Sequence, residues 1–266
     1  CKLPSNPRYF QVRRSKTIEK LKNNELVKIC SMGHFLPFYV AHAADAGFDA
    51  IWLDTEHRAW DVRELQAVYA YCHQYDIDCM LRPASIDKVT LYRHLEDGAA
   101  GMLVPHVNDV DRAVHLRDCL KFPPLGERGI DGVGQDNGFK FSDANDFTSQ
   151  ANENTFLICQ IETPEAVANA EAIIATKGVD GVFVGPGDLQ LRITKNHADF
   201  TLEEAIEKVA ALCKQYGKAW GLPVGDVETG KKRFQQGARL LAYGGEFVAL
   251  VNMLNENSRG MDEMLS

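Results

Sequence analysis

Short apolar runs alternate with longer amphipathic segments along almost the whole chain, and this alternation restricts the fold more than any other feature. Each run has the length of a buried strand and apolar residues on both faces, as parallel strands do. Eight runs occur, at residues 27–31, 50–54, 79–82, 101–105, 156–162, 181–184, 219–224 and 240–243. Eight alternating β and α units favour a closed α/β barrel, the (β/α)8 or TIM barrel, over the alternative of an open doubly wound sheet.

The segments between the runs are predicted helices. They cover residues 38–46, 62–75, 87–97, 109–120, 164–175, 202–216 and 227–236. Pro164 follows a capping threonine, and residues 201–204 match a capping box, so at least two of these helices have clear start signals. Another helix is expected over residues 15–23, before the first strand.

A single domain over residues 1–266 accounts for the length, because a barrel of this type needs about 250 residues. Three regions lie outside the alternation: residues 1–24, an N-terminal extension with its helix; 122–154, a long region expected to be irregular; and 246–266, a C-terminal helix and tail. An irregular stretch this long in a compact domain is usually functional.

Composition excludes several classes of protein. A net charge of −8 argues against nucleic-acid binding, which requires a basic surface. The sequence has no apolar run of the ~20 residues needed to cross a membrane, and its first 14 residues lack the apolar stretch of a signal peptide. The seven cysteines form no Cys-x-x-Cys pair, so we expect buried thiols in a reducing cytoplasm.

Polar side chains follow five consecutive runs of the predicted barrel. These segments are Asp54-Thr55-Glu56-His57-Arg58, Arg82-Pro83, Pro105-His106, Gln160-Ile161-Glu162 and Gly185-Pro186-Gly187-Asp188. Catalytic groups of such barrels lie at the carboxyl ends of the strands. A charge at a strand end must be paired or ligated, and the sequence therefore predicts a polar site at this end.

Two carboxylates in these segments, Glu162 and Asp188, form a candidate metal site. Oxygen ligands with open positions suit a hard divalent ion such as Mg²⁺ or Mn²⁺, and Co²⁺ or Zn²⁺ are also compatible. The alternative is structural: Glu162 pairs with Arg82, and Asp188 caps the following turn.

His57 is a candidate general base, because a histidine exchanges protons near neutral pH; a purely structural role is the alternative. Arg82 could hold an anionic oxygen, or pair with Asp54 or Glu56. No lysine at a strand end is an obvious Schiff-base nucleophile, since Lys140 lies in the long irregular region and Lys218 at the start of a strand.

These segments resemble, in order, motifs of the HpcH/HpaI aldolase family, from about residue 26 to residue 254. The matching segments are Ala46-Gly47-Phe48-Asp49, Asp54-x-Glu56-His57, Arg82-Pro83, Leu103-Val104-Pro105, Pro123-Pro124-x-Gly126-x-Arg128-Gly129, Gln160-Ile161-Glu162 and Val179-Asp180-Gly181-Val182-Phe183-Val184-Gly185-Pro186-x-Asp188-Leu189.

The resemblance implies a metal-dependent aldolase that reversibly cleaves a 4-hydroxy-2-oxo acid into pyruvate and an aldehyde. Glu162 and Asp188 would ligate the divalent ion, and pyruvate would chelate it. His57 would be the base, and Arg82 would stabilise the enolate oxygen. Gln160 would contact the keto acid, and the amides of Gly187 and Asp188 would hold its carboxylate.

The resemblance also implies a homo-hexamer, a trimer of dimers that exchange their C-terminal helices.

The sequence departs from the family pattern at Thr55, where glycine is common, and at Gly187, where alanine or serine is common. The aspartate that orients the catalytic histidine corresponds to Glu96, with Asp97 beside it, and residues 130–141 do not match. Alternatives are an oxaloacetate decarboxylase, a citrate-lyase-like acyl-CoA lyase and a catalytically silent barrel.

Overall fold

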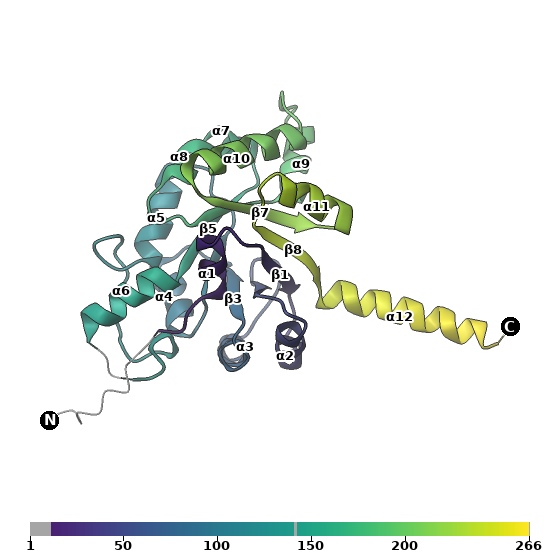
Figure 1. Ribbon diagram of the computed structural model, residues 1–266, viewed down its shortest axis with the longest axis horizontal. Helices are drawn as coiled ribbons and strands as arrows, with labels where there is room; N and C mark the ends of the chain where they lie inside the picture. The colour runs from purple at the N-terminus through teal and green to yellow at the C-terminus, as the bar shows by residue number, and fades with distance from the viewer. Residues whose placement is uncertain (1–11, 141–142, 266) are drawn as a thin grey trace.

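A computed structural model describes residues 12–140 and 143–265 and shows a closed barrel of eight parallel strands in sequential order, which excludes the open sheet (Figure 1). Each predicted run contains a strand, with bounds that differ by at most two residues. The strands are β1 (Val27–Met32), β2 (Ala50–Asp54), β3 (Asp78–Arg82), β4 (Gly101–Val104), β5 (Phe156–Ile161), β6 (Gly181–Val184), β7 (Ala219–Val224) and β8 (Leu240–Gly245).

Helices surround the barrel and connect its strands. They are α1 (Lys16–Lys22), α2 (Pro37–Asp45), α3 (Val62–Gln74), α4 (Lys88–Glu96), α5 (Val110–Leu120), α6 (Ala144–Asn154), α7 (Pro164–Ala168), α8 (Ala170–Ala175), α9 (Pro186–Lys195), α10 (Leu202–Tyr216), α11 (Val227–Gln235) and α12 (Glu246–Glu263), with a short 3-10 helix η1 (Gln135–Asn137). The predicted capping box is present at α10, where Thr201 caps the helix and Glu204 completes the box. Helix α3 has a second capping box, made by Asp61 and Glu64, which was not predicted.

The apolar core has two layers. The inner layer fills the barrel with side chains such as Met80, Phe156 and Phe183, and the outer layer lies between the strands and the helices. Gly101 is required by this packing, because a Cβ there would lie 2.3 Å from the ring of Phe156. The six described cysteines are buried free thiols, as expected, and Cys1 lies outside the described residues.

Three features differ from the sequence-based expectation. Residues 122–154 are not irregular throughout, because η1 and α6 lie within them. The predicted helix over residues 164–175 is interrupted at Asn169, which separates α7 from α8. Helix α9 was not predicted at all, because Gly185-Pro186-Gly187 has the composition of a turn, whereas in the structure Pro186 begins the helix.

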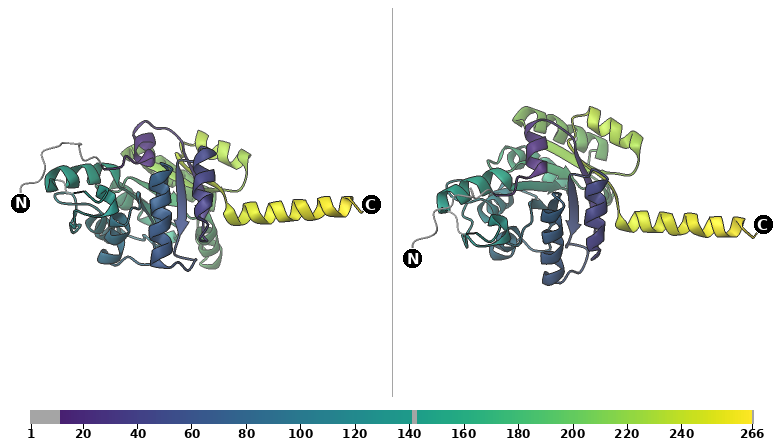
Figure 2. Two further views of the ribbon diagram at one scale, coloured as in Figure 1. Left: turned by 90° about the horizontal axis from the view of Figure 1, so that it is seen from below. Right: turned by 60° about the horizontal axis from the view of Figure 1, so that its bottom comes forward.

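The final helix, α12, projects from the barrel into solvent (Figures 1 and 2). It follows β8 directly, and Glu246 is its one buried residue. None of the helices in the two described segments has the length and hydropathy needed to cross a bilayer.

Candidate active site

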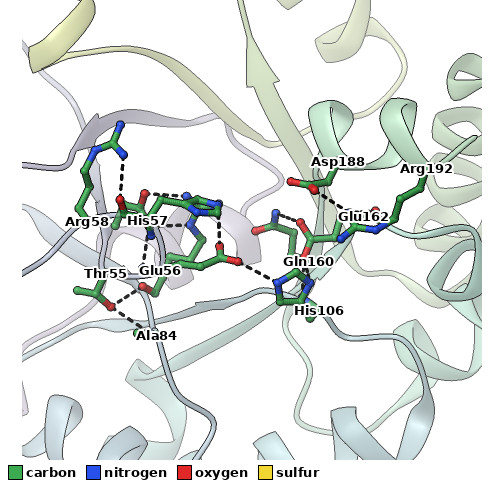
Figure 3. A network of polar contacts seen from close by, with 12 residues as sticks. Thr55, Glu56, His57, Arg58, Ala84, His106, Gln160, Glu162, Asp188 and Arg192 are labelled. Carbon is green, nitrogen blue, oxygen red and sulfur yellow. Dashed lines mark hydrogen bonds and ion pairs between the residues drawn. The ribbon is translucent and has the colours of Figure 1, made fainter. Parts of the chain in front are cut away.

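The predicted polar segments meet at the carboxyl ends of the strands, as Figure 3 shows. We call this end of the barrel the mouth. One half carries His57, which follows β2, and Arg82, the last residue of β3. The other half carries residues that follow β4, β5 and β6, including Glu162 and Asp188.

Arg82 is fixed from three sides at the end of β3. Its Nε and Nη2 donate to the two carboxylate oxygens of Asp54 at 3.0 and 2.8 Å. Its Nη1 lies 3.1 Å from Oε2 of Glu56, and its guanidinium lies over the ring of Trp52. Burial acts to raise the pKa of Asp54, but the hydrogen bonds and charge of Arg82 outweigh it and hold that pKa below its ordinary value.

His57 is the most accessible of the predicted catalytic side chains, with 56% of its side chain exposed. Its Nε2 lies 3.6 Å from Oε2 of Glu56, and its backbone N donates to Asp54. The imidazole can therefore reach a ligand in the mouth.

Thr55, the departure from the family pattern, links two strand ends. Its hydroxyl donates to the carbonyl of Arg82 at 2.8 Å and accepts from the amide of Ala84 at 3.1 Å. The side chain thereby stabilises the contact between the ends of β2 and β3.

Glu162 is a buried carboxylate with only 2% of its side chain exposed. Its Oε1 accepts from the backbone N of His106 at 2.6 Å, and its Oε2 accepts from Nε2 of Gln160 at 2.6 Å. Burial raises the pKa of Glu162 above its ordinary value; the hydrogen bond and charge of His106 oppose the rise, and the charges of Glu56 and Asp188 add to it. Figure 3 shows Asp188 beside Glu162, so the two predicted metal ligands lie on the same half of the mouth.

Asp188 lies in the first turn of α9 and pairs with Arg192, whose Nη1 is 2.7 Å from its Oδ1. It does not cap the helix, since the cap is Gly185 without a side-chain bond. The amides of Gly187 and Asp188 belong to the first turn, where intrahelical acceptors are absent, so they can bind an anion. Glu162 does not pair with Arg82, whose ion pairs in the described structure are with Asp54 and Glu56.

His106 is a site residue that the sequence did not single out, beyond its place after the fourth run. Its Nδ1 lies 3.0 Å from Oε1 of Glu162, and its Nε2 lies 3.0 Å from Oε1 of Glu56. The imidazole bridges the two halves of the mouth (Figure 3). Arg192 was also missed, because only the unpredicted helix α9 places it beside Asp188.

Within a single chain, Glu96 does not lie beside His57. It is the last residue of α4, on the connection that leads into the start of β4, and so lies toward the opposite end of the barrel from the mouth. Its nearest charges include Arg128 and Asp136, and burial raises its pKa above the ordinary value. Asp97 accepts a hydrogen bond from Gln66 in the same region.

The residues present fit a divalent cation. Two buried or partly buried carboxylates lie together, and Oε1 of Gln160 is buried without a hydrogen-bond partner among the described residues. Gly185 keeps the space beside Glu162 open, because a Cβ there would lie 3.1 Å from Oε2. Within residues 12–140 and 143–265 no three His, Cys, Asp or Glu side chains form a metal cluster. An ion would therefore take two protein ligands and complete its shell with water or substrate oxygens.

Active sites of (β/α)8 barrels lie at the carboxyl ends of the strands, and two carboxylates, a fixed arginine and two histidines at this mouth are typical of a barrel enzyme. The family model described as HpcH/HpaI aldolase/citrate lyase matches residues 34–252. The chain therefore belongs to the HpcH/HpaI aldolase/citrate lyase family, and it is a carbon–carbon lyase.

Individual relatives agree with this assignment. A hydroxypyruvate/pyruvate aldolase of Pseudomonas aeruginosa is 30% identical over 240 residues, which cover 90% of this chain and 89% of the relative. A 4-hydroxy-2-oxo-heptane-1,7-dioate aldolase of Shigella boydii is 32% identical over 207 residues, which cover 76% of this chain and 77% of the relative. The crystal structure of an HpcH/HpaI aldolase from Desulfitobacterium hafniense has a TM-score of 0.86 at 27% identity, covering 92% of this chain and 96% of that one.

Proposed function

We propose that the protein is a divalent-metal-dependent aldolase that reversibly cleaves a 4-hydroxy-2-oxo acid, of the 2-keto-3-deoxy sugar acid type, into pyruvate and an aldehyde. The observation that carries this proposal is that Glu162 and Asp188 lie side by side in a mouth that also holds His57 (Figure 3), with Arg82 at the end of β3. The names of the two aldolase relatives support the same substrate class. The oxygen ligands favour Mg²⁺ or Mn²⁺.

Cleavage leaves an electron pair on the carbon that becomes the methyl group of pyruvate, and the neighbouring keto oxygen takes up that charge as an enolate. A divalent ion held by Glu162 and Asp188 would supply positive charge at this oxygen. Arg82 adds a second cation, and its bonds to Asp54 and Glu56 hold it in place before the reaction begins. Fixed charges of this kind are usually the largest contribution to catalysis.

The reaction also requires a base for the proton of the 4-hydroxyl group. We assign this role to His57, because its imidazole is accessible in the mouth. Gln160 contacts the keto acid through its side-chain amide, and the amides of Gly187 and Asp188 hold the carboxylate at the start of α9.

Cleavage assays with and without EDTA test the mechanism. We expect activity to disappear on chelation and return with Mg²⁺ or Mn²⁺. Activity that survives complete chelation but is lost on borohydride trapping would show a Schiff base instead. Lys218, one of the two lysines considered for that role, directly precedes β7 and donates to the carbonyl of Val179, so it lies at the opposite end of the strand from the mouth.

The same purified protein can be assayed to distinguish three alternative functions. Oxaloacetate decarboxylation would form the same enolate, and an acyl-CoA lyase would cleave a panel of thioesters. A catalytically silent barrel would cleave none of these substrates with any divalent ion.

The surface of α12 supports assembly with further copies of the chain. Phe247, Leu250, Val251 and Leu254 are exposed and lie at helical spacing on this projecting helix. We propose that this apolar stripe packs against a second copy within the homo-hexamer that the family resemblance implies. The cytoplasmic location remains a prediction.

A further inference from the structure

The backbone of His106 has an uncommon conformation. Its φ angle is +56°, in the left-handed region that residues other than glycine seldom adopt. Such conformations persist when the surrounding structure holds them, and they are frequent at functional sites. His106 lies two residues after β4, at the edge of the mouth.

This conformation brings two nitrogens of His106 to one oxygen of Glu162. The backbone N donates to Oε1 of Glu162 at 2.6 Å, and Nδ1 lies 3.0 Å from the same atom. On the other side of the ring, Nε2 lies 3.0 Å from Oε1 of Glu56. About half of the His106 side chain is exposed, so no packing requirement of the core explains its position.

The far anchor of this bridge is itself fixed. Oε2 of Glu56 lies 3.1 Å from Nη1 of Arg82, which is bound in turn by Asp54. A continuous series of contacts therefore joins Arg82, Glu56, His106 and Glu162 across the mouth. Figure 3 shows the part from Glu56 through His106 to Glu162. The series ends at the buried carboxylate of Glu162.

We propose that His106 is a positioning residue that holds the Glu162 carboxylate in the orientation needed to bind a divalent cation. This inference rests on the proposed function. With Oε1 held by His106 and Oε2 held by Gln160, the carboxylate is fixed before an ion arrives, and lone pairs remain for the ion shared with Asp188. Hydrogen bonds to ligating carboxylates typically contribute 10- to 100-fold to metal affinity.

The experiment measures Mn²⁺ binding, without substrate, from the electron paramagnetic resonance signal of the free ion. His106→Gly removes the imidazole but keeps the amide and suits the left-handed backbone. His106→Asn also tolerates that backbone and offers a side-chain amide in place of Nδ1. His197→Gly is the matched control, because His197 has a φ of +52° and lies beyond the end of α9, away from Asp188.

We expect the affinity of His106→Gly to fall about 10- to 100-fold. His106→Asn should stay within about threefold of the wild type, and His197→Gly should be unchanged. Thermal denaturation verifies that each variant is folded. Equal or tighter Mn²⁺ binding by His106→Gly, or an Asn variant as weak as the Gly variant, would overturn the inference while leaving the proposed function intact. A wild-type protein that binds no Mn²⁺ would overturn both.

Discussion

The guanidinium carbon of Arg82 lies 4.7 Å from the centroid of the Trp52 ring, which itself packs edge-on against Phe183 inside the barrel. Trp52 lies within β2, and its ring supports the arginine from below the mouth. Stacking and two hydrogen bonds to Asp54 fix the plane of the guanidinium together. A lysine has neither the planar group nor the paired donors.

Replacement of Arg82 by lysine should therefore reduce kcat about 100-fold, because the fixed charge at the developing enolate is lost. Steady-state cleavage kinetics measure the effect. Arg233→Lys is the control, since Arg233 on α11 makes a two-pronged ion pair with Glu203 on α10, and neither residue contacts the residues of the mouth. The control should lose stability without losing kcat; an equal loss of kcat in both variants would contradict the role of Arg82.

Glu162→Gln should abolish metal binding and reduce kcat by at least about 10²- to 10³-fold, because an amide is a poor ligand for a hard cation. Metal content by mass spectrometry and cleavage kinetics provide the two measurements. Glu165→Gln changes the same residue type on the exposed face of α7 and should behave as the wild type. Retained metal in Glu162→Gln would remove Glu162 from the ligand set.

Two glycines at the start of α9 should respond differently to alanine. A Cβ on Gly185 would lie 2.8 Å from Nε2 of Gln160 and 2.9 Å from Cβ of Glu162, whereas a Cβ on Gly187 meets nothing within 4 Å. We expect Gly185→Ala to weaken metal binding about tenfold, because it displaces Glu162 and its partner. Gly187→Ala should keep activity within about threefold. Isothermal titration with Mn²⁺ compares the pair, and equal affinities would contradict the steric argument.

The Asp54–Arg82 pair should make stability depend on acid pH. The pKa of Asp54 in the folded protein is below its ordinary value of 3.8, so the pair stabilises the fold above that value and the contribution disappears as the pH falls through the lowered pKa. At neutral pH, Asp54→Asn should lose about 1–3 kcal/mol. The difference from the wild type in urea unfolding should shrink on acidification below about pH 4, and a difference independent of pH would exclude this origin.

The apolar stripe of α12 should control assembly. Leu250→Glu with Leu254→Glu places two charges on the stripe, and we expect light scattering after size-exclusion chromatography to show a smaller species than the wild type. Asn252→Glu with Asn255→Glu adds the same charge at polar positions of the helix and is the matched control. An unchanged mass for the leucine variant would exclude the stripe as an interface.

The sequence predicted the barrel and the position of the main site residues because both depend on a strong periodic pattern. An apolar run followed by a charge locates a strand end, and closure of the barrel then brings the ends of β2, β3, β5 and β6 to one mouth. Each of the residues His57, Arg82, Glu162 and Asp188 follows or ends such a run.

Features without a periodic pattern could not be predicted in this way. Helix α6 has few apolar residues, and its buried contacts come from Phe147 and Ala151 against Phe122. The bridge made by His106 depends on a left-handed backbone that no neighbouring residue type requires. Glu96 was assigned from the family resemblance alone, and its role toward a catalytic histidine stays a prediction, because one chain does not bring it to His57.

The base of α12 is bound to the rim of the mouth, since Glu246 accepts from the amide of Gly33 at 2.7 Å and lies 2.9 Å from Nδ1 of His34. The helix has 18 residues and is about 27 Å long, so a tilt of about 10° at its base moves its tip by about 5 Å. Substitutions of Gly33, His34 or Glu246 at the rim should therefore also displace the tip of α12, because a small distortion at the base of the helix is amplified along its length.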